Sequence, residues 1–444
     1  MTSSGTASAE AAPAEFRRTP KRAAAAALVG TSIEWYDFFI YATAAALVFR
    51  EVFFDPSLPP VVGFVVAFGT TSFGYLGRPV GALLFGSLGD KIGRKRTLVV
   101  TLLLMGTATF CMGLLPTYAS VGALAPVLLV TLRFLQGVAV GGEWGGAAML
   151  SVEHAPEGRR TFMGSFTQMG SSVGALFSSL IFLIAERMGG LLEGWWRLPF
   201  LFSAVLVIVA LIVRSTVQES PEFQVAKQTG QISLTPVKDV FTKHRKLVLL
   251  GAGVMLVATG GYYVTSSFFL AYGADEAGVS TELLLNALTI GAIAEVLLMP
   301  VAGWLGDKIS PQFVATIGLV GIAVIAYPLF LSTHSGSPVL IIGMCVIVAA
   351  CTAFNYGPMP HILYRLFPIQ VRYTGVSLSY QAAALTSGAL TPIVVPLLLA
   401  AGGGNPGLVV AYTAVLCLAA VACVRLTRRV PEVRTESSAA QAAA

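Results

Sequence analysis

The sequence predicts an all-helical membrane protein with twelve transmembrane helices, arranged as two six-helix pseudo-repeats. The first observation is composition: of 444 residues, 55% are hydrophobic and only 11% are charged, whereas soluble proteins carry about 25% charged residues. The mean hydropathy of +0.78 agrees with this. These values exclude a large soluble enzyme, a disordered scaffold and a secreted disulfide framework.

The second observation is the spacing of apolar stretches. A spanning helix needs about 20 mostly apolar residues. Twelve such stretches start near residues 24, 61, 98, 123, 162, 199, 247, 283, 313, 339, 375 and 406. The 46 glycines and 23 prolines suit a membrane bundle, because glycine lets helices approach closely and neighbouring groups satisfy the backbone freed by proline.

The third observation is the placement of positive charge. With a cytoplasmic N-terminus, 23 of the 28 Lys and Arg residues fall in cytoplasmic segments. Arg78 and Arg133 fall within spans, and only Arg50, Arg187 and Arg197 fall in segments on the external side. Insertion keeps positive loops in the cytoplasm, so both termini are expected there, in a multi-pass protein of the cell membrane. The net charge of +6 is then explained by topology, and no nucleic acid partner is expected.

One long polar segment divides the helices into two groups of six. The expected organisation is a cytoplasmic tail over 1–22, a six-helix bundle over 23–213, a cytoplasmic and partly helical central loop over 214–246, a second bundle over 247–426, and a cytoplasmic tail over 427–444. Two halves joined by such a loop are typical of transporters built from internal repeats.

A short internal repeat supports the two halves. Residues 86–92 and 303–309 both read Gly-x-x-Gly-Asp-Lys-Ile, after the second helix of each half. Asp90 and Asp307 occupy the same place in the two copies. Such an aspartate caps a following helix or pairs with a basic neighbour. The first copy continues with Gly-Arg-Lys-Arg, whereas the second continues with Ser-Pro and lacks the basic residues.

The segment 77–96, Gly-Arg-Pro-Val-Gly-Ala-Leu-Leu-Phe-Gly-Ser-Leu-Gly-Asp-Lys-Ile-Gly-Arg-Lys-Arg, resembles the signature loop of the major facilitator superfamily. Four further segments narrow the resemblance: Glu34-Trp-Tyr-Asp-Phe38, residues 133–143, Trp196-Arg-Leu-Pro-Phe200 and residues 367–375. Together they resemble the metabolite–proton symporter family, which includes proline/betaine, shikimate, citrate and 2-oxoglutarate permeases. The resemblance runs from about residue 24 to residue 426.

The resemblance implies the major facilitator fold and alternating access around a midplane site. It implies a secondary active transporter for proton-coupled uptake of a small polar metabolite, an organic acid or a zwitterion, with protons, the metabolite and the lipid bilayer as partners. We expect a monomer. The residues expected to gate the cytoplasmic side are Gly86, Asp90, Gly93, Arg94 and Asp307.

Three departures from the family pattern concern the second half. The second signature loop is truncated, Tyr364 and Arg365 stand where the family has an acidic residue, and Glu295 lies within a span where an uncharged residue is expected. These changes leave open a second function, export of an organic acid or natural product by proton exchange. Helix five lacks the Gly-Pro motif of drug antiporters, which argues against multidrug efflux.

Ionisable residues within spans mark candidate functional positions, because a charge in the hydrocarbon is costly. Glu34 and Asp37 are three residues apart and share a helix face. Two close carboxylates disfavour double ionisation, so one of them binds a proton readily. We predict that this pair couples transport to protons, with Asp37 ahead of Glu34. The alternative is that one of them pairs structurally with Arg133.

Arg133 is the candidate ligand for a substrate carboxylate, because its guanidinium fork suits that group. A permanent ion pair with Glu34 or Asp37 is the competing interpretation. Gln136 follows one turn later on the same face. Glu143 is expected to hydrogen-bond to backbone at a helix contact. Arg78 is expected to extend its guanidinium toward the cytoplasmic end of its helix.

Glu295 is either a further protonation site or a residue that faces a polar cavity. Other polar residues within the spans are softer candidates for substrate contact, since many such residues only join helices. They are Tyr36, Gln168, Tyr262, Tyr263, Asn355 and Gln381.

No metal site, catalytic residue or cofactor is predicted. The five cysteines all fall in apolar spans without a Cys-x-x-Cys pattern, and the four histidines are scattered. An intramembrane enzyme or a transporter-like sensor is therefore disfavoured.

Overall fold

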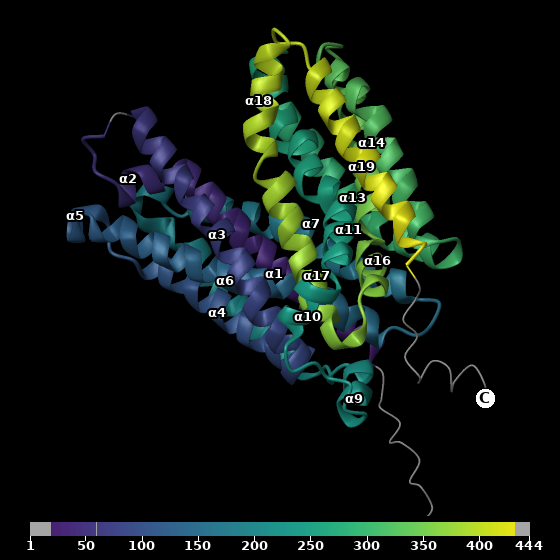
Figure 1. Cartoon of the computed structure of the whole chain (residues 1–444). Coiled ribbons are helices and arrows are strands. Elements are labelled where there is room, and N and C mark those ends of the chain that lie inside the picture. The colour runs from purple at the N-terminus through teal and green to yellow at the C-terminus, as the bar shows by residue number, and fades with distance from the viewer. Residues whose placement is uncertain (1–18, 59, 431–444) are drawn as a thin grey trace, which may run out of the picture.

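The computed structural model describes residues 19–58 and 60–430, and every regular element in these ranges is a helix. Most of the two predicted tails, residues 1–18 and 431–444, lies outside the described residues. The remaining chain forms two helical bundles joined by a linker that contains two short helices (Figure 1).

The first bundle contains six long helices. They are α1 (Pro20–Leu47), α3 (Pro60–Ile92), α4 (Arg94–Leu114), α6 (Leu124–His154), α7 (Arg160–Arg187) and α8 (Arg197–Ser215). Two short helices, α2 (Phe49–Phe53) and α5 (Tyr118–Val121), lie between the ends of these long helices.

The second bundle contains six spans, three of which are interrupted. They are α11 (Arg245–Leu256) with α12 (Phe269–Asp275), α13 (Thr281–Lys308), α14 (Pro311–Thr333), α15 (Pro338–Tyr356) with α16 (Met359–Leu366), α17 (Arg372–Ala383) with α18 (Thr391–Ala401), and α19 (Gly407–Thr427). Each of the twelve expected starts lies within about four residues of the start of one of these spans.

Within the described residues, ten of these spans are long and apolar enough to cross a membrane by length and composition alone. The remaining two, α1 and α3, contain 28 and 33 residues and pack inside the first bundle against α7 and α6. Helices dominate because each satisfies its own backbone hydrogen bonds, which lipid cannot do.

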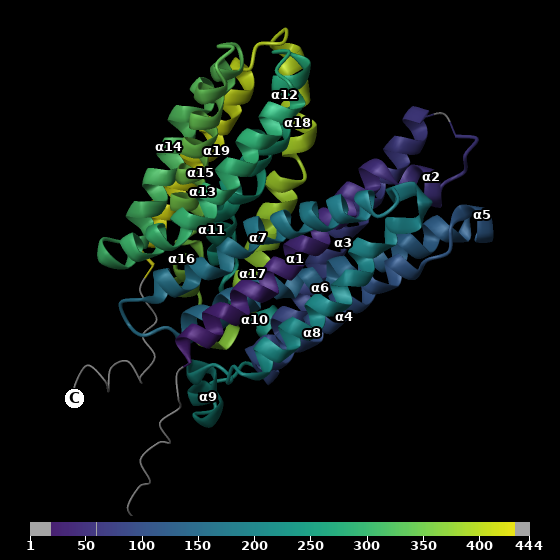
Figure 2. The ribbon, with the colours of Figure 1, turned by 180° about the vertical axis from the view of Figure 1, so that it is seen from behind.

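The two bundles meet at one end of the molecule and diverge toward the other (Figures 1 and 2). The meeting end holds the linker helices α9 (Pro221–Gln228) and α10 (Pro236–Lys243) and both ends of the described chain; we refer to it as the terminal end. There α3 packs against α17, and α7 packs against α13. The opposite end carries α2, α5 and α18.

Glycines bring α3 and α6 close together within the first bundle. A Cβ atom on Gly137 would lie 2.9 Å from the Cα atom of Gly74, and one on Gly141 would lie 2.9 Å from the carbonyl carbon of Arg78. Only glycine fits such a separation. The close approach places the two intramembrane arginines of these helices, Arg78 and Arg133, in neighbouring positions.

Candidate functional site

A buried chain of hydrogen bonds joins α1, α4 and α6. Thr109 donates to the Oδ2 atom of Asp37 at 2.6 Å. The amide of Gln136 donates to the Thr109 hydroxyl at 2.7 Å, and Arg133 donates to the amide oxygen of Gln136. Asp37 is fully buried, and only 5% of Arg133 is exposed. The predicted residues Asp37, Arg133 and Gln136 therefore lie together in one network.

The charges of this cluster are not paired with one another. Among the described residues Arg133 forms no ion pair with a carboxylate; its guanidinium instead lies 4.0 Å from the ring centre of Tyr41. One oxygen each of Glu34 and Asp37, and the Nε atom of Arg133, have no hydrogen-bond partner in the described chain. This structure therefore lacks the ion pair of Arg133 with Glu34 or Asp37 that was the competing interpretation.

A cavity of about 10 Å³ lies among Glu34, Asp37, Arg78 and Arg133. This volume is about the minimum that holds one water molecule. The cavity reaches three helices, α1, α3 and α6, and all four ionisable side chains border it. The space beside the acids can therefore hold about one water molecule, whereas it excludes a metabolite.

Arg78 also lines a much larger cavity of about 150 Å³ between the two bundles. Its guanidinium lies 4.7 Å from the ring centre of Tyr75 and 5.7 Å from that of Phe38. Among the described residues it forms no ion pair or hydrogen bond. The second bundle contributes Tyr262, Tyr263, Tyr380 and their neighbours to the same cavity.

Arg78 does not extend toward the end of its helix as expected. It lies 13 residues before Lys91 along α3, which at 1.5 Å per residue is about 20 Å. That distance is longer than an arginine side chain. The position of Arg78 deep within the apolar span is the signal that would have identified it as a candidate ligand.

A second cavity, of about 220 Å³, is lined in part by Glu295. It is walled by the second bundle and by Phe39 of α1, and it shares Phe39, Tyr262, Ser266 and Ser267 with the cavity of Arg78. Both cavities lie beside π-helical turns over Val257–Gly261 and Val264–Phe268. Such turns are frequent at functional sites. We refer to the two spaces together as the two-lobed cavity.

At the terminal end, the two repeat aspartates each bind a helix of the other bundle. Asp90 accepts hydrogen bonds from the backbone N–H groups of Tyr373 and Thr374, at 3.0 and 2.9 Å, at the start of α17. Asp307 accepts from Thr161 and Phe162, both at 2.8 Å, at the start of α7. Each aspartate therefore caps a helix, which was one of the two alternatives predicted from the sequence. The capped helix belongs to the opposite half of the chain and is not the helix that follows.

The other predicted gating residues surround Asp90. A Cβ atom on Gly86 would lie 2.9 Å from the Cα atom of Thr374, so glycine permits the contact of α3 with α17. Gly93 has φ of 110°, a conformation that favours glycine, and turns the chain between α3 and α4. Arg94 follows and pairs with Asp90 at 3.5 Å.

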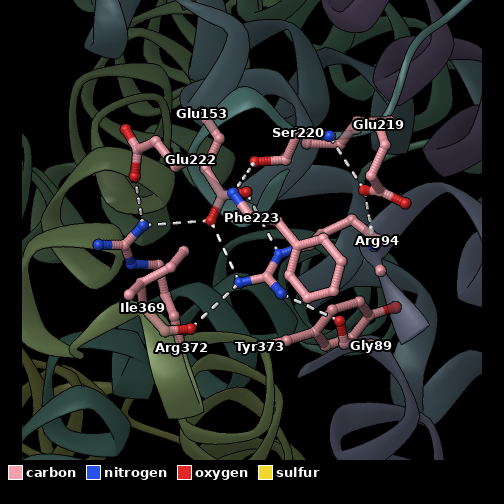
Figure 3. A network of polar contacts seen from close by, with 12 residues as sticks. Gly89, Arg94, Glu153, Glu219, Ser220, Glu222, Phe223, Ile369, Arg372 and Tyr373 are labelled. Atoms are coloured by element: carbon pink, nitrogen blue, oxygen red, sulfur yellow. Dashed lines mark hydrogen bonds and ion pairs between the residues drawn. The ribbon is translucent and has the colours of Figure 1, made fainter. Parts of the chain in front are cut away.

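A buried charge network extends from Arg94 (Figure 3). Glu153 of α6 pairs with Arg94 at 3.2 Å and with Arg372 of α17 at 3.1 Å. Glu222 of the linker pairs with Arg372 at 2.7 Å and with Arg160 of α7 at 2.9 Å. The network thus connects both bundles through the linker.

The linker also caps a helix through Glu219. Its carboxylate accepts the backbone N–H groups of Arg94, at 2.9 Å, and Lys95 at the start of α4. Sequence reasoning did not assign roles to Glu153, Glu219 or Glu222. A signal was present in the linker, whose charged residues are mostly basic: two glutamates flank Ser220-Pro221, a pair typical of a helix start.

Comparison with known proteins agrees with this architecture. The family model of the Major Facilitator Superfamily matches residues 27–385. The chain belongs to the major facilitator superfamily. It is 37% identical to the inner membrane metabolite transport protein YhjE of Escherichia coli, over 91% of this chain and 93% of that protein. It is 36% identical to the shikimate transporter of Escherichia coli, over 90% and 92%.

The same fold is present in solved structures. The proton:xylose symporter XylE, bound to 6-bromo-6-deoxy-D-glucose, superposes with a TM-score of 0.75 and 18% identity, covering 93% of this chain and 96% of that chain. This facilitator is therefore a multi-pass membrane transporter of metabolites, with relatives in the bacterial inner membrane, and not an enzyme.

The remaining predicted residues of this facilitator occupy different surroundings. Tyr262 and Tyr263 line the two-lobed cavity. Tyr36 is buried in the first bundle and donates to the carbonyl of Pro199 at 2.7 Å. Gln168 joins the bundles: its amide donates to the Tyr356 carbonyl at 3.2 Å, and its oxygen accepts from the Trp144 indole at 2.9 Å.

Two further candidates are buried in the second bundle. Asn355 and Gln381 are 1% and 2% exposed, and their amide oxygens accept no hydrogen bond from the described residues.

Glu143 pairs with Arg214 of α8 and accepts from Thr101 at 2.5 Å. Its role is a contact between helices, as expected, although its partners are side chains.

Proposed function

We propose that this facilitator takes up a small, polar, carboxylate-bearing metabolite together with protons, by alternating access. The observation that carries the proposal is the position of Arg78 and Phe38. Both line the large cavity on one side and the small cavity of Glu34 and Asp37 on the other. The substrate space and the acid pair are therefore separated by a single layer of side chains.

Arg78 supplies the ligand for the substrate carboxylate. Its guanidinium faces a space of metabolite size, is held by aromatic rings, and has no carboxylate partner in the described chain. A cation in this state gains most by binding an anion that enters without its full hydration shell. The substrate then occupies the surface shared by the two bundles.

Protons are carried by Asp37 and Glu34. When a substrate carboxylate neutralises Arg78, the nearby positive charge that favours ionised acids is weakened, and proton binding to the acid pair becomes easier. By linkage, a bound proton strengthens substrate binding by the same factor. Thr109 and Gln136 connect Asp37 to Arg133, which adds a second cation that responds to the proton.

The terminal end serves as the cytoplasmic gate. The bias of Lys and Arg toward the expected cytoplasmic segments supports both termini lying in the cytoplasm. The division into bundles over 23–213 and 247–426, with a linker over 214–246 and tails over 1–22 and 427–444, belongs to the same proposal. The Asp90, Asp307 and Glu222 contacts close this gate, so that the two-lobed cavity serves substrate from outside. One chain contains both halves, which supports a monomer.

The test uses purified protein in liposomes that contain a pH-sensitive dye. Carboxylates and zwitterions are added outside, and internal pH is followed. We expect acidification with at least one compound, reduced to background in Asp37→Asn and in Arg78→Gln. Glu282→Gln, a change of an exposed glutamate at the start of α13, is the control and should transport normally.

The direction of the response decides between uptake and exchange. Alkalinisation, or a response only when substrate is preloaded inside, would replace uptake by proton-exchange export. Full activity in Asp37→Asn would remove Asp37 from the coupling mechanism.

A further inference from the structure

The two lobes of the two-lobed cavity carry opposite charges. Arg78 borders the lobe of about 150 Å³, and Glu295 borders the lobe of about 220 Å³. The two lobes are adjacent, because Phe39, Tyr262, Ser266 and Ser267 line both of them. The cavity is thus cationic at its first-bundle side and anionic at its second-bundle side.

Glu295 has no structural use that explains its burial. Only 6% of the residue is exposed, and among the described residues it makes no ion pair or hydrogen bond. Most of the residues around it are apolar or hydroxyl-bearing, including Gly291, Cys345, Val348 and Thr352. A carboxylate in such surroundings is costly unless a partner arrives, and the cavity is the space from which a partner can come.

The lobe of Glu295 fits a cationic group better than a second anion. The hydroxyl-bearing residues Thr265, Ser266, Ser267 and Thr352 line it, and hydroxyl oxygens accept hydrogen bonds from an ammonium group. The rings of Phe39 and Tyr262 at the junction of the lobes add faces that attract cations. A second carboxylate there would meet the uncompensated charge of Glu295.

We infer that the two-lobed cavity binds a zwitterion, with its carboxylate on Arg78 and its ammonium group on Glu295. This inference rests on the proposed function and adds the substrate class. A zwitterion neutralises both buried charges at once. A plain carboxylate neutralises only Arg78 and leaves Glu295 unpaired, whereas a dicarboxylate is repelled at the second lobe.

The test is a binding titration on the full-length protein in nanodiscs. The probes are ω-amino carboxylates of two to six carbons, the same acids without the amino group, the corresponding dicarboxylates, and N-trimethylated forms of the amino acids. We expect at least one amino or trimethylammonium acid to bind about tenfold or more tighter than its plain counterpart, as for other charge-assisted contacts. The chain length that binds best reports the spacing of the two charges.

Variants separate the two ends of the ligand. Glu295→Gln, which keeps the shape of the side chain, should remove the preference for the amino group while the plain acid keeps its affinity within about twofold. Arg78→Gln should weaken both classes. Glu282→Gln on the same helix is the control, and it should preserve both affinities and the preference.

Each other outcome has a defined meaning. Equal or tighter binding of plain acids or dicarboxylates, with Arg78 still required, would overturn the zwitterion while leaving carboxylate transport intact. A Glu295→Gln variant that keeps the preference for the amino group but loses proton uptake would assign Glu295 to the proton. A requirement for Na⁺ in place of the amino group would assign Glu295 to a coupling ion. Either result would overturn the inference. Absence of binding across all probes would overturn the proposed function as well.

Discussion

The two repeat loops perform the same capping contact in different electrostatic surroundings. Asp90 binds the first N–H groups of α17, and Asp307 binds those of α7. Beside Asp90 stand Arg94 and the network through Glu153. Four residues after Asp307 the chain has Pro311 in place of the arginine. The cap is kept in both halves, whereas an arginine four residues after the aspartate is present only in the first half.

A second position shows the same asymmetry. Glu153 lies seven residues before Arg160, and Arg365 lies seven residues before Arg372. Arg160 and Arg372 themselves correspond, since each directly precedes the N–H groups that the opposite aspartate binds. The second half therefore carries an arginine where the first half carries the central acid. The comparison teaches that the two backbone caps are kept although the arginine and the acid beside them differ between the halves.

The largest effect is expected from removing the centre of the network. Glu153→Gln leaves Arg94 and Arg372 buried with one carboxylate fewer between them, and breaking a buried pair in this way costs about 3–5 kcal/mol. We expect a marked drop in the thermal unfolding temperature of the purified protein. Glu282→Gln, at an exposed site, should change stability by no more than about 0.5 kcal/mol. An unfolding temperature equal to wild type would show that the network contributes little.

A smaller effect is expected from removing the two capping aspartates, and its size should differ between them. Asp90→Ala and Asp307→Ala each remove two hydrogen bonds to a helix N-terminus, and losing such a cap costs about 1–2 kcal/mol. Asp90→Ala also removes the contact with Arg94. We expect it to open the terminal end about fivefold more than Asp307→Ala, a difference of about 1 kcal/mol.

The measurement is the alkylation rate of a buried reporter cysteine. Ser377→Cys reports on the contact of α17 with α6, and Ser165→Cys reports on that of α7 with α13, each in a chain whose native cysteines are replaced. Equal rates for the two aspartate variants at both reporters would show that Arg94 adds nothing to the cap.

The smallest effect is expected from copying the arginine and the acid of the first half into the second half. Pro311→Arg with Arg365→Glu places an arginine and an acid at the positions that correspond to Arg94 and Glu153. We expect slower reporter alkylation in the double variant than the two single variants predict, with a coupling of about 0.5 kcal/mol, at the lower end for residues in contact. Purely additive effects would contradict the equivalence of the two halves at this level.

The comparison also separates what was predictable in the site from what was not. The repeat predicted equivalent roles for Asp90 and Asp307. It also predicted that each aspartate caps a helix or pairs with a basic residue. The repeat could not predict which helix is capped. The capped helix belongs to the other half of the chain and contacts the aspartate only when both bundles have packed together. The roles of Glu153 and Glu222 could not be predicted for the same reason, because their partners lie more than 50 residues away in the sequence.

The intramembrane charges show the same limit. Spacing placed Glu34 and Asp37 on one face, and the structure brings Asp37 to Gln136 and Arg133 through Thr109. Sequence reasoning preferred Arg133 as the substrate ligand, whereas Arg78 is the arginine that faces the large cavity. Both residues are single cations in apolar helices, and only the rotation of α3 and α6 distinguishes them.

The sequence by itself determined the number, length and order of the spans, because a backbone in lipid must satisfy its hydrogen bonds within each helix and about 20 apolar residues are needed to cross. It also determined the two-fold repeat and the biased placement of positive charge. The tertiary structure decided which face of each helix meets the cavity and which charges meet across the bundles. Those outcomes depend on helix rotation and close packing between distant segments, which glycines such as Gly137 and Gly141 permit but periodicity alone does not specify.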